Sequence, residues 1–146
     1  MNFSIEPMQE QDRETVLAMM RTFYASPAVL TNGSETIFAA DIDACVSDSP
    51  YLEGFMFRRA DAVLGYAMAA KSFSTEFGKP CIWVEDLYIK PEYRGQGIGS
   101  AFLMHMADNY PNAILRLEVE EENRRAVAVY EKCGFRELPY MEMKRE

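Results

Sequence analysis

The chain has few residues that could bind a metal or form a disulfide framework. Its 146 residues include one histidine, His105, and three cysteines, Cys45, Cys81 and Cys133, which lack the short spacing of metal ligands. An odd number of widely spaced cysteines indicates reduced thiols, as in the cytoplasm. One histidine cannot form a histidine cluster, and we therefore expect no metal cofactor.

The chain also lacks a long apolar run and an excess of basic residues. No stretch has the length of a membrane span, and the N-terminus does not have the pattern of a secretion signal. Its 15 basic and 23 acidic residues give a net charge of −8, which argues against a nucleic-acid-binding surface. The sequence predicts a cytoplasmic protein with no membrane or nucleic-acid partner, and its acidic charge is compatible with a cationic substrate.

The spacing of apolar residues predicts one α/β domain over residues 1–146. The length, with 49% apolar and 26% charged residues, is typical of a single globular domain. Helical and alternating patterns follow the order β-α-α-β-β-β-α-β-α-β, and this order fits a mixed sheet with helices on both faces. The expected strands are 3–5, 51–59, 63–72, 81–89, 113–119 and 135–144, and the expected helices are 10–25, 34–46, 97–109 and 123–132.

A glycine-rich segment is the most informative part of the sequence. It reads Arg94-Gly95-Gln96-Gly97-Ile98-Gly99-Ser100 and joins an apolar strand to an amphipathic helix. Glycines leave backbone N–H groups uncovered, and the first turn of a helix has N–H groups without an internal partner. Together they form a nest for a phosphate or diphosphate, and the arginine adds a guanidinium suited to phosphate oxygens. The segment predicts binding of a phosphorylated small molecule.

The glycine spacing argues against two other phosphate sites. The spacing here is G-x-G-x-G, whereas the dinucleotide fingerprint of an oxidoreductase needs G-x-G-x-x-G after the first strand. No Gly-Lys-Ser/Thr follows, as a P-loop requires. The structural alternative is a turn that only reverses the chain, but such a turn needs neither the arginine nor three glycines.

Two segments resemble the acyl-CoA signatures of the GCN5-related N-acetyltransferases, the GNAT family. Residues 94–99 are similar to the family pattern R/Q-x-x-G-x-G/A, and residues 123–135 to the pattern N-x-x-A-x-x-x-Y-x-x-x-G-F. The detailed correspondence covers residues 80–136. The resemblance implies one N-acetyltransferase domain over residues 1–146, with a mixed sheet flanked by helices on both faces and with acetyl-CoA as co-substrate. Its diphosphate would bind Arg94, Gly95, Gln96, Gly97, Ile98, Gly99 and Ser100.

The resemblance also implies roles for residues outside the glycine-rich segment. Glu85 would accept the proton of the amine, directly or through water, and Tyr130 would protonate the departing thiolate. Asn123 would present its amide to the pantetheine arm of CoA. The backbone that would pair with this arm belongs to Leu87, Tyr88 and Ile89. The structural alternatives are a paired carboxylate for Glu85 and a core tyrosine with a satisfied hydroxyl for Tyr130.

Two adjacent carboxylates interrupt the apolar strand 81–89. Strand alternation places Glu85, with Leu87 and Ile89, on one face, and Asp86, with Tyr88, on the other. Burial of an unpartnered carboxylate costs several kcal/mol. We therefore expect different roles for the two acids, and a structural one for Asp86.

The sequence thus predicts an enzyme that transfers an acetyl group from acetyl-CoA to a primary amine by direct attack. The Glu85-Asp86 pair resembles polyamine acetyltransferases and favours a small cationic amine, while amino acids, aminoglycosides and protein N-termini remain open as acceptors. A non-catalytic CoA-binding or regulatory module is the alternative from another class. The sequence does not determine the oligomeric state. The resemblance alone implies a homodimer, because members of the family often form one.

Overall fold

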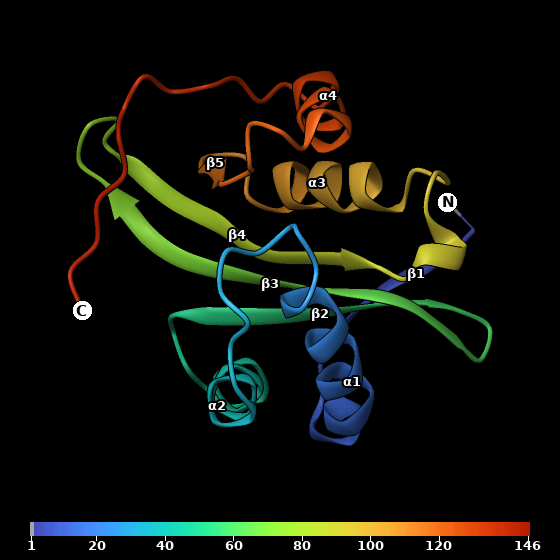
Figure 1. Cartoon of the computed structure of the whole chain (residues 1–146). Helices are drawn as coiled ribbons and strands as arrows, with labels where there is room; N and C mark the ends of the chain where they lie inside the picture. The colour runs from blue at the N-terminus through green and yellow to red at the C-terminus, as the bar shows by residue number, and fades with distance from the viewer. Residues whose placement is uncertain (1) are drawn as a thin grey trace.

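The computed structural model describes residues 2–146 and has a five-stranded sheet between two layers of helices (Figure 1). The strands lie side by side in the order β1-β2-β3-β4-β5. All neighbours are antiparallel except β4 and β5, which are parallel. The predicted α/β fold with a mixed sheet is confirmed. The elements are β1 (Ser4–Pro7), the 3₁₀ turn η1 (Glu10–Asp12), α1 (Arg13–Tyr24), α2 (Glu35–Val46), β2 (Leu52–Arg59), β3 (Ala62–Ser74), β4 (Lys79–Ile89), the 3₁₀ turn η2 (Pro91–Tyr93), α3 (Ile98–Asn109), β5 (Ile114–Leu117) and α4 (Arg124–Lys132).

Each face of the sheet is covered by one pair of helices, and each pair has its own apolar core (Figure 1). The core under α1 and α2 contains Met20 and Ile42 from the helices and Met56 from the sheet. The core under α3 contains Phe102 from the helix and Phe57 from the sheet. Burial of such side chains contributes about 1.5–3 kcal/mol each, so the two cores hold the helices against the sheet. No helix within residues 2–146 is long and apolar enough to cross a lipid bilayer.

The C-terminal segment differs from the prediction. Residues 135–144 were expected to form a strand, but the structure has no strand after α4. Met141 and Met143 are 87% and 86% exposed. Alternating apolar residues form a strand only where a sheet edge offers hydrogen-bonding partners, and in this structure the segment lies along the outside without such pairing.

Strand β4 carries a bulge at Glu85. Met68 of β3 pairs with Asp86, and the next residue, Ala69, pairs with Val84. Glu85 is therefore an extra residue that has no partner on β3. A bulge of this kind bends the strand and interrupts its ladder of hydrogen bonds.

The bulge also breaks the alternation expected for this strand. Val84 packs in the α3-side core together with Leu87 and Ile89. Tyr88 belongs to the core under α1 and α2, and Asp86 bonds to tyrosines of that core. The predicted separation of Leu87 and Ile89 from Asp86 and Tyr88 is thus observed, but alternation does not decide the direction of the bulge residue itself.

Candidate functional site

The candidate site lies where β4 and β5 part. The two strands pair only over Cys81–Val84 and Ile114–Leu117, and β4 then continues to Ile89 without a strand beside it on that edge in residues 2–146. A free strand edge can pair with an extended ligand as an added strand would. The predicted pantetheine-binding residues, 87–89, lie on this unpaired part of β4.

The glycine-rich loop follows directly from this strand edge and leads into α3. Gly95 and Gly97 both have φ 78°, a left-handed conformation that glycine adopts without strain. Gly97 is the N-cap of α3, and the first helical hydrogen bond runs from the Ala101 N–H to the Gly97 carbonyl at 3.0 Å. Within residues 2–146, no backbone N–H of residues 95–100 donates to a protein acceptor. These free donors at a helix N-terminus suit an anion such as phosphate.

Arg94 is held at the start of the loop by its neighbours on β4. Its Nε donates to the Ile89 carbonyl at 2.8 Å, and its guanidinium lies 5.6 Å from the centre of the Tyr88 ring. These contacts fix the guanidinium beside the loop, where we predicted a contact with phosphate.

Two further arginines approach the same loop from other elements. Arg59, the last residue of β2, donates to Gln96 Oε1 at 2.9 Å. The Nη2 atom of Arg125, on α4, lies 3.6 Å from the position that a Cβ at Gly95 would occupy. In residues 2–146, neither these arginines nor Arg94 has a carboxylate within 4.0 Å. Sequence reasoning missed Arg59 because no motif connects the end of β2 with the loop.

Three carboxylates, Asp41 of α2 and Glu85 and Asp86 of β4, lie within electrostatic range of one another, and Asp86 is turned toward the core under α1 and α2. Asp86 is 4% exposed, and burial raises its pKa. Partial burial, and then the charge of Asp86, raise the pKa of Glu85. Burial and the charges of both acids raise the pKa of Asp41, on α2, to about 6. No lysine or arginine of the described chain lowers any of these three pKa values, and the region is therefore electrostatically suited to a cation. Asp41 was not predicted, because only the packing of α2 brings it near β4.

The two predicted residues of the second motif lie at opposite ends of α4. Asn123 is the N-cap, and its Oδ1 accepts from the Ala126 N–H at 3.3 Å. This capping bond leaves the amide NH₂ of Asn123 free for a ligand. Tyr130 packs against the α3-side core, with its ring 6.2 Å from that of Phe135, and burial raises the pKa of its hydroxyl. Tyr130 therefore stays protonated at neutral pH.

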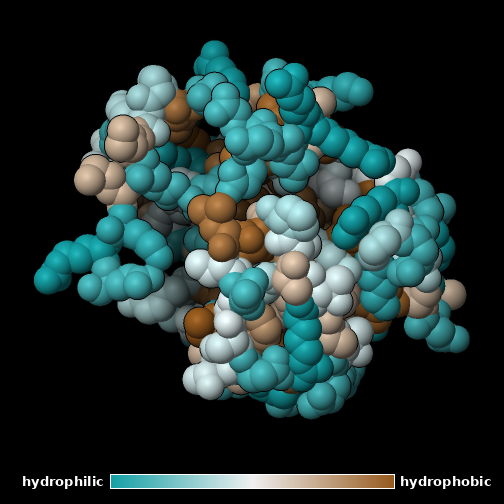
Figure 2. Space-filling model, in the orientation of Figure 1, coloured by the Kyte–Doolittle hydropathy of each residue, from teal (hydrophilic) through white to brown (hydrophobic). Residues whose placement is uncertain are grey.

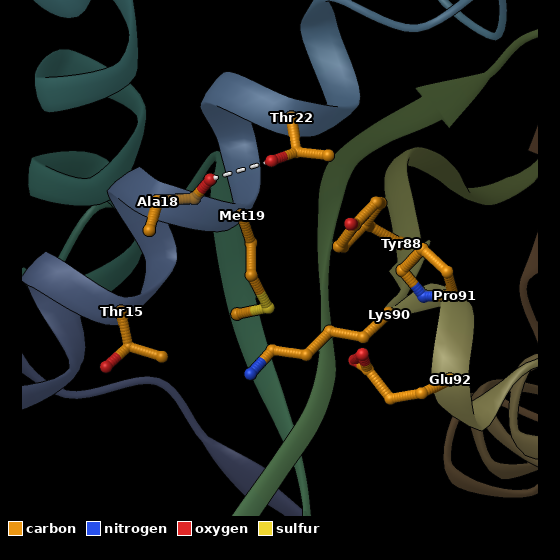
Figure 3. A pocket seen from close by; sticks show the side chains of 8 residues that line it. All are labelled: Thr15, Ala18, Met19, Thr22, Tyr88, Lys90, Pro91 and Glu92. Carbon is orange, nitrogen blue, oxygen red and sulfur yellow. Dashed lines mark hydrogen bonds between the residues drawn. The ribbon is translucent and has the colours of Figure 1, made fainter.

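A cavity of about 480 Å³ lies between α1 and the turn after β4 (Figure 3). Tyr88 lines it from β4, and the Lys90 side chain extends across it toward Met19 of α1. The lining residues are Thr15, Ala18, Met19, Thr22, Tyr88, Lys90, Pro91 and Glu92. None of them is a predicted catalytic residue, and Tyr88 is one of the three predicted pantetheine-binding residues. The face of the molecule seen in the orientation of Figure 1 is mostly hydrophilic, with apolar residues exposed near its middle (Figure 2).

Comparison with known proteins identifies the family of the chain. Residues 17–135 match the acetyltransferase (GNAT) family. The thialysine N-ε-acetyltransferase of Bos taurus is 42% identical over 79 residues, which cover 52% of this chain and 46% of that protein. Its counterpart in Sus scrofa is 37% identical over 83 residues, covering 55% and 48%. The chain thus matches about half the length of these relatives.

Solved structures share the fold over the whole chain. A possible acetyltransferase from Clostridium difficile 630 has a TM-score of 0.82 at 21% identity, and the match covers 100% of this chain and 98% of that one. The aminoglycoside acetyltransferase AAC(6')-Iy, solved with the bisubstrate analog CoA-S-monomethyl-acetylneamine, has a TM-score of 0.77 at 16% identity, with 100% and 99% covered. At such identities the likeness concerns the fold alone.

Proposed function

Because the chain belongs to the GNAT acetyltransferase family, we propose that it transfers an acetyl group from acetyl-CoA to a primary amine. The observation that carries this proposal is that two nearby segments, the β4 edge and the loop after it, both have free hydrogen-bonding groups. The β4 edge beyond Val84 has no strand partner, and the N–H groups of residues 95–100 have no protein acceptor in the described chain. Both belong to one stretch of sequence that leads from a strand to a helix.

The chemistry of CoA fits these groups. Its pantetheine arm contains amides, which match the unpaired strand edge at 87–89, and its diphosphate matches the loop amides together with Arg94. When bound, acetyl-CoA supplies a thioester whose carbonyl carbon is open to attack by an amine.

Glu85 and a backbone N–H of β4 would act on the attacking side. The Glu85 carboxylate accepts a proton from the substrate ammonium, and its raised pKa makes it a stronger base than an ordinary glutamate. A β4 backbone N–H donates a hydrogen bond to the carbonyl oxygen as negative charge develops there. The deprotonated amine forms the new C–N bond, the C–S bond breaks, and the nitrogen gives up its second proton to water as the amide forms.

Tyr130 would act on the leaving sulfur. Its hydroxyl donates a proton to the thiolate, and its raised pKa ensures that the proton is present. The same raised pKa makes the transfer uphill by about 1.4 kcal/mol for each pKa unit that separates the phenol from the thiol. The proton that the nitrogen releases to water returns to the phenolate and restores the hydroxyl. Because the amine attacks the thioester directly, no acyl-enzyme is required.

The acceptor side favours a small cationic amine. Asp41, Glu85 and Asp86 form a partly buried acidic region without a basic partner among the groups that shift their pKa values. A substrate ammonium placed there would offset their mutual repulsion. The two relatives with 42% and 37% identity are named for an acceptor that carries a side-chain amine, although the match covers about half of each.

An assay of CoA release over a panel of amines tests the proposal. The panel contains thialysine, lysine, a diamine, a polyamine, an aminoglycoside and a peptide with N-terminal alanine. We expect turnover with a small cationic amine, and a Tyr130→Phe variant should lower kcat by about a hundredfold with little change in KM. CoA binding without turnover of any amine would instead support a non-catalytic CoA-binding module. Absence of CoA binding would overturn the proposal.

A further inference from the structure

Asp86 is a buried carboxylate whose two oxygens both accept hydrogen bonds from tyrosines. Its Oδ1 accepts from the Tyr24 hydroxyl at 2.9 Å, and its Oδ2 accepts from the Tyr66 hydroxyl at 2.6 Å. It has no salt bridge to any described residue. A well-packed apolar side chain would fill this position at lower cost, because a buried ionised group loses its hydration. The carboxylate therefore suggests a requirement other than stability.

The two tyrosines connect Asp86 with separate elements. Tyr24 is the last residue of α1, and Tyr66 lies in β3. The Tyr24 ring also packs on Phe38 of α2, with ring centres 5.1 Å apart. The hydrogen bonds of Asp86 thus join α1, β3 and β4 at one point, and the ring contact extends this junction to α2. The segment between α1 and α2 starts immediately after Tyr24.

This junction lies directly beside the bulge. Glu85, the residue before Asp86, has no partner on β3, so the ladder does not fix its orientation. The two side-chain bonds of Asp86 therefore anchor β4 at the residue directly after the one that the ladder leaves unpaired.

We propose that Asp86 is a positioning residue, which aims Glu85 at the acceptor amine and, through Tyr24, fixes the end of α1 as a wall of the acceptor site. This inference rests on the proposed acetyltransferase function. It assigns Asp86 no contact with substrate and no part in proton transfer. The glycine-rich loop belongs to a different segment of the chain. We therefore expect Asp86 to affect binding of the amine and not binding of CoA.

The charge of Asp86 also acts on Glu85, together with groups from every neighbouring element. Asp86 and Glu142, of the C-terminal segment, raise the pKa of Glu85. Asp41 of α2, Tyr24 of α1 and Glu118, just after β5, are the other titratable groups within its electrostatic range. All of these groups are acidic, so removal of the Asp86 charge lowers the pKa of Glu85. The acid limb of kcat/KM for the amine then moves to lower pH.

The test compares Asp86→Asn with Tyr24→Phe. Asp86→Asn removes the charge and weakens both hydrogen bonds, whereas Tyr24→Phe removes one hydrogen bond and keeps the charge. We expect both variants to raise KM for the amine by about tenfold, the loss associated with a hydrogen bond to a charged group. Only Asp86→Asn should move the acid limb to lower pH. Calorimetry should give an unchanged Kd for CoA in both variants.

Three results separate failure of this inference from failure of the proposed function. An amine KM and a pH profile that stay unchanged in Asp86→Asn would overturn the inference. Equal losses of CoA binding and amine binding would also overturn it, because they indicate a general structural role. If Asp86→Asn does not fold, KM for the amine and Kd for CoA are compared in Tyr24→Phe and Tyr66→Phe instead, because both variants retain the Asp86 carboxylate. A wild-type protein that neither binds CoA nor acetylates any amine would overturn the proposed function itself.

Discussion

At the scale of single residues, the glycines of the loop differ in what they require. Gly97 has φ 78°, which any other residue adopts only at a cost, although no atom would contact an added Cβ within 4 Å. Gly99 has no such φ, and a Cβ there would make an ordinary contact of 3.8 Å with the Leu87 side chain. The backbone conformation at position 97 therefore favours glycine. At position 99, neither the backbone conformation nor the available space excludes a larger residue.

This difference gives a matched pair of variants. In Gly97→Ala, the left-handed conformation costs about 1–2 kcal/mol, so the loop spends less time with its N–H groups aimed at the ligand. We expect Kd for CoA to rise by about tenfold. Gly99→Ala should leave it unchanged. Calorimetry of both variants measures this directly, and equal affinities would show that the loop amides do not bind the diphosphate.

Arg125 and its neighbour Arg124 provide a second matched pair. The Arg125 guanidinium lies against the loop at Gly95, whereas Arg124 lines a separate small hollow with Glu121 and Glu122. We expect Arg125→Gln to weaken CoA binding by about threefold to tenfold through loss of a charged hydrogen bond to phosphate. Arg124→Gln should have little effect.

The ligand can be varied in the same experiment. Pantetheine, which has no phosphate, should bind wild type and Arg125→Gln with equal affinity. Comparison of CoA with dephospho-CoA then shows which phosphate Arg125 contacts. If Arg124→Gln weakens binding as much as Arg125→Gln does, the effect is that of net charge and the contact is not specific.

At the scale of elements, β4 has two different sides. Its edge beyond Val84 is unpaired and leads to the anion-binding loop, and one of its faces presents Asp86 to the core under α1 and α2. The bulge and the parting from β5 occur at the same place along the strand. A single strand therefore carries both the edge proposed to bind the cofactor and two of the acids proposed to bind the acceptor.

Asp41 of α2 lies near the carboxylates of Glu85 and Asp86, and we expect this to make the free energy of unfolding depend on pH. The pKa of Asp41 rises from its ordinary value of 3.8 to about 6 in the folded protein. Between these values the folded form binds more protons than the unfolded form, so the Asp41 contribution to stability falls as pH rises through this window. The loss of stability caused by ionised Asp41 reaches its full size above about pH 6 and is absent below pH 3.8.

We therefore expect Asp41→Asn to raise the Tm at pH 7.5 and to leave it unchanged near pH 3.5. Thermal unfolding of both proteins across this pH range is the measurement. An equal gain at both pH values would show that the charge of Asp41 is not the cause. In the amine assay the same variant should raise KM for a cationic acceptor, because it removes one negative charge from the site.

At the scale of the whole molecule, the net charge of −8 opposes an anionic ligand such as CoA. Binding therefore depends on the local loop amides and on the arginines that approach them from β2 and α4. Asp41, Glu85 and Asp86 lie within electrostatic range of one another near the bulge of β4, where we propose that a cationic amine binds. The proposed reaction is therefore compatible with the local positions of the charged groups, although the net charge alone disfavours CoA.

The change in Tm on addition of ligand tests whether the folded protein binds CoA. A ligand at a hundred times its Kd stabilises a protein by about 2.7 kcal/mol, which corresponds to a rise in Tm of roughly 5–10 °C for a chain of this size. We expect CoA and acetyl-CoA to produce this rise and NAD to produce none. Stabilisation by NAD alone would support the oxidoreductase reading that the glycine spacing disfavours.

The sequence by itself determined the order of elements through α4, the mixed sheet, the glycine loop and the family resemblance. These features depend on residues close together in the chain, such as the apolar strand that leads through Pro91 into the loop, and local spacing is enough to identify them. For the same reason the positions of Tyr130 and Asn123 on one short helix could be predicted.

Only the tertiary structure decided the bulge at Glu85, the approach of Arg59 to the loop and the hydrogen bonds of Asp86. Tyr24 lies 62 residues from Asp86 in the chain, and Arg59 lies 37 residues from Gln96. Contacts over such separations follow from how the helices pack and how the strands align, and no local pattern contains them. The predicted strand at 135–144 was wrong for the same physical reason, since a strand depends on the neighbour with which it pairs.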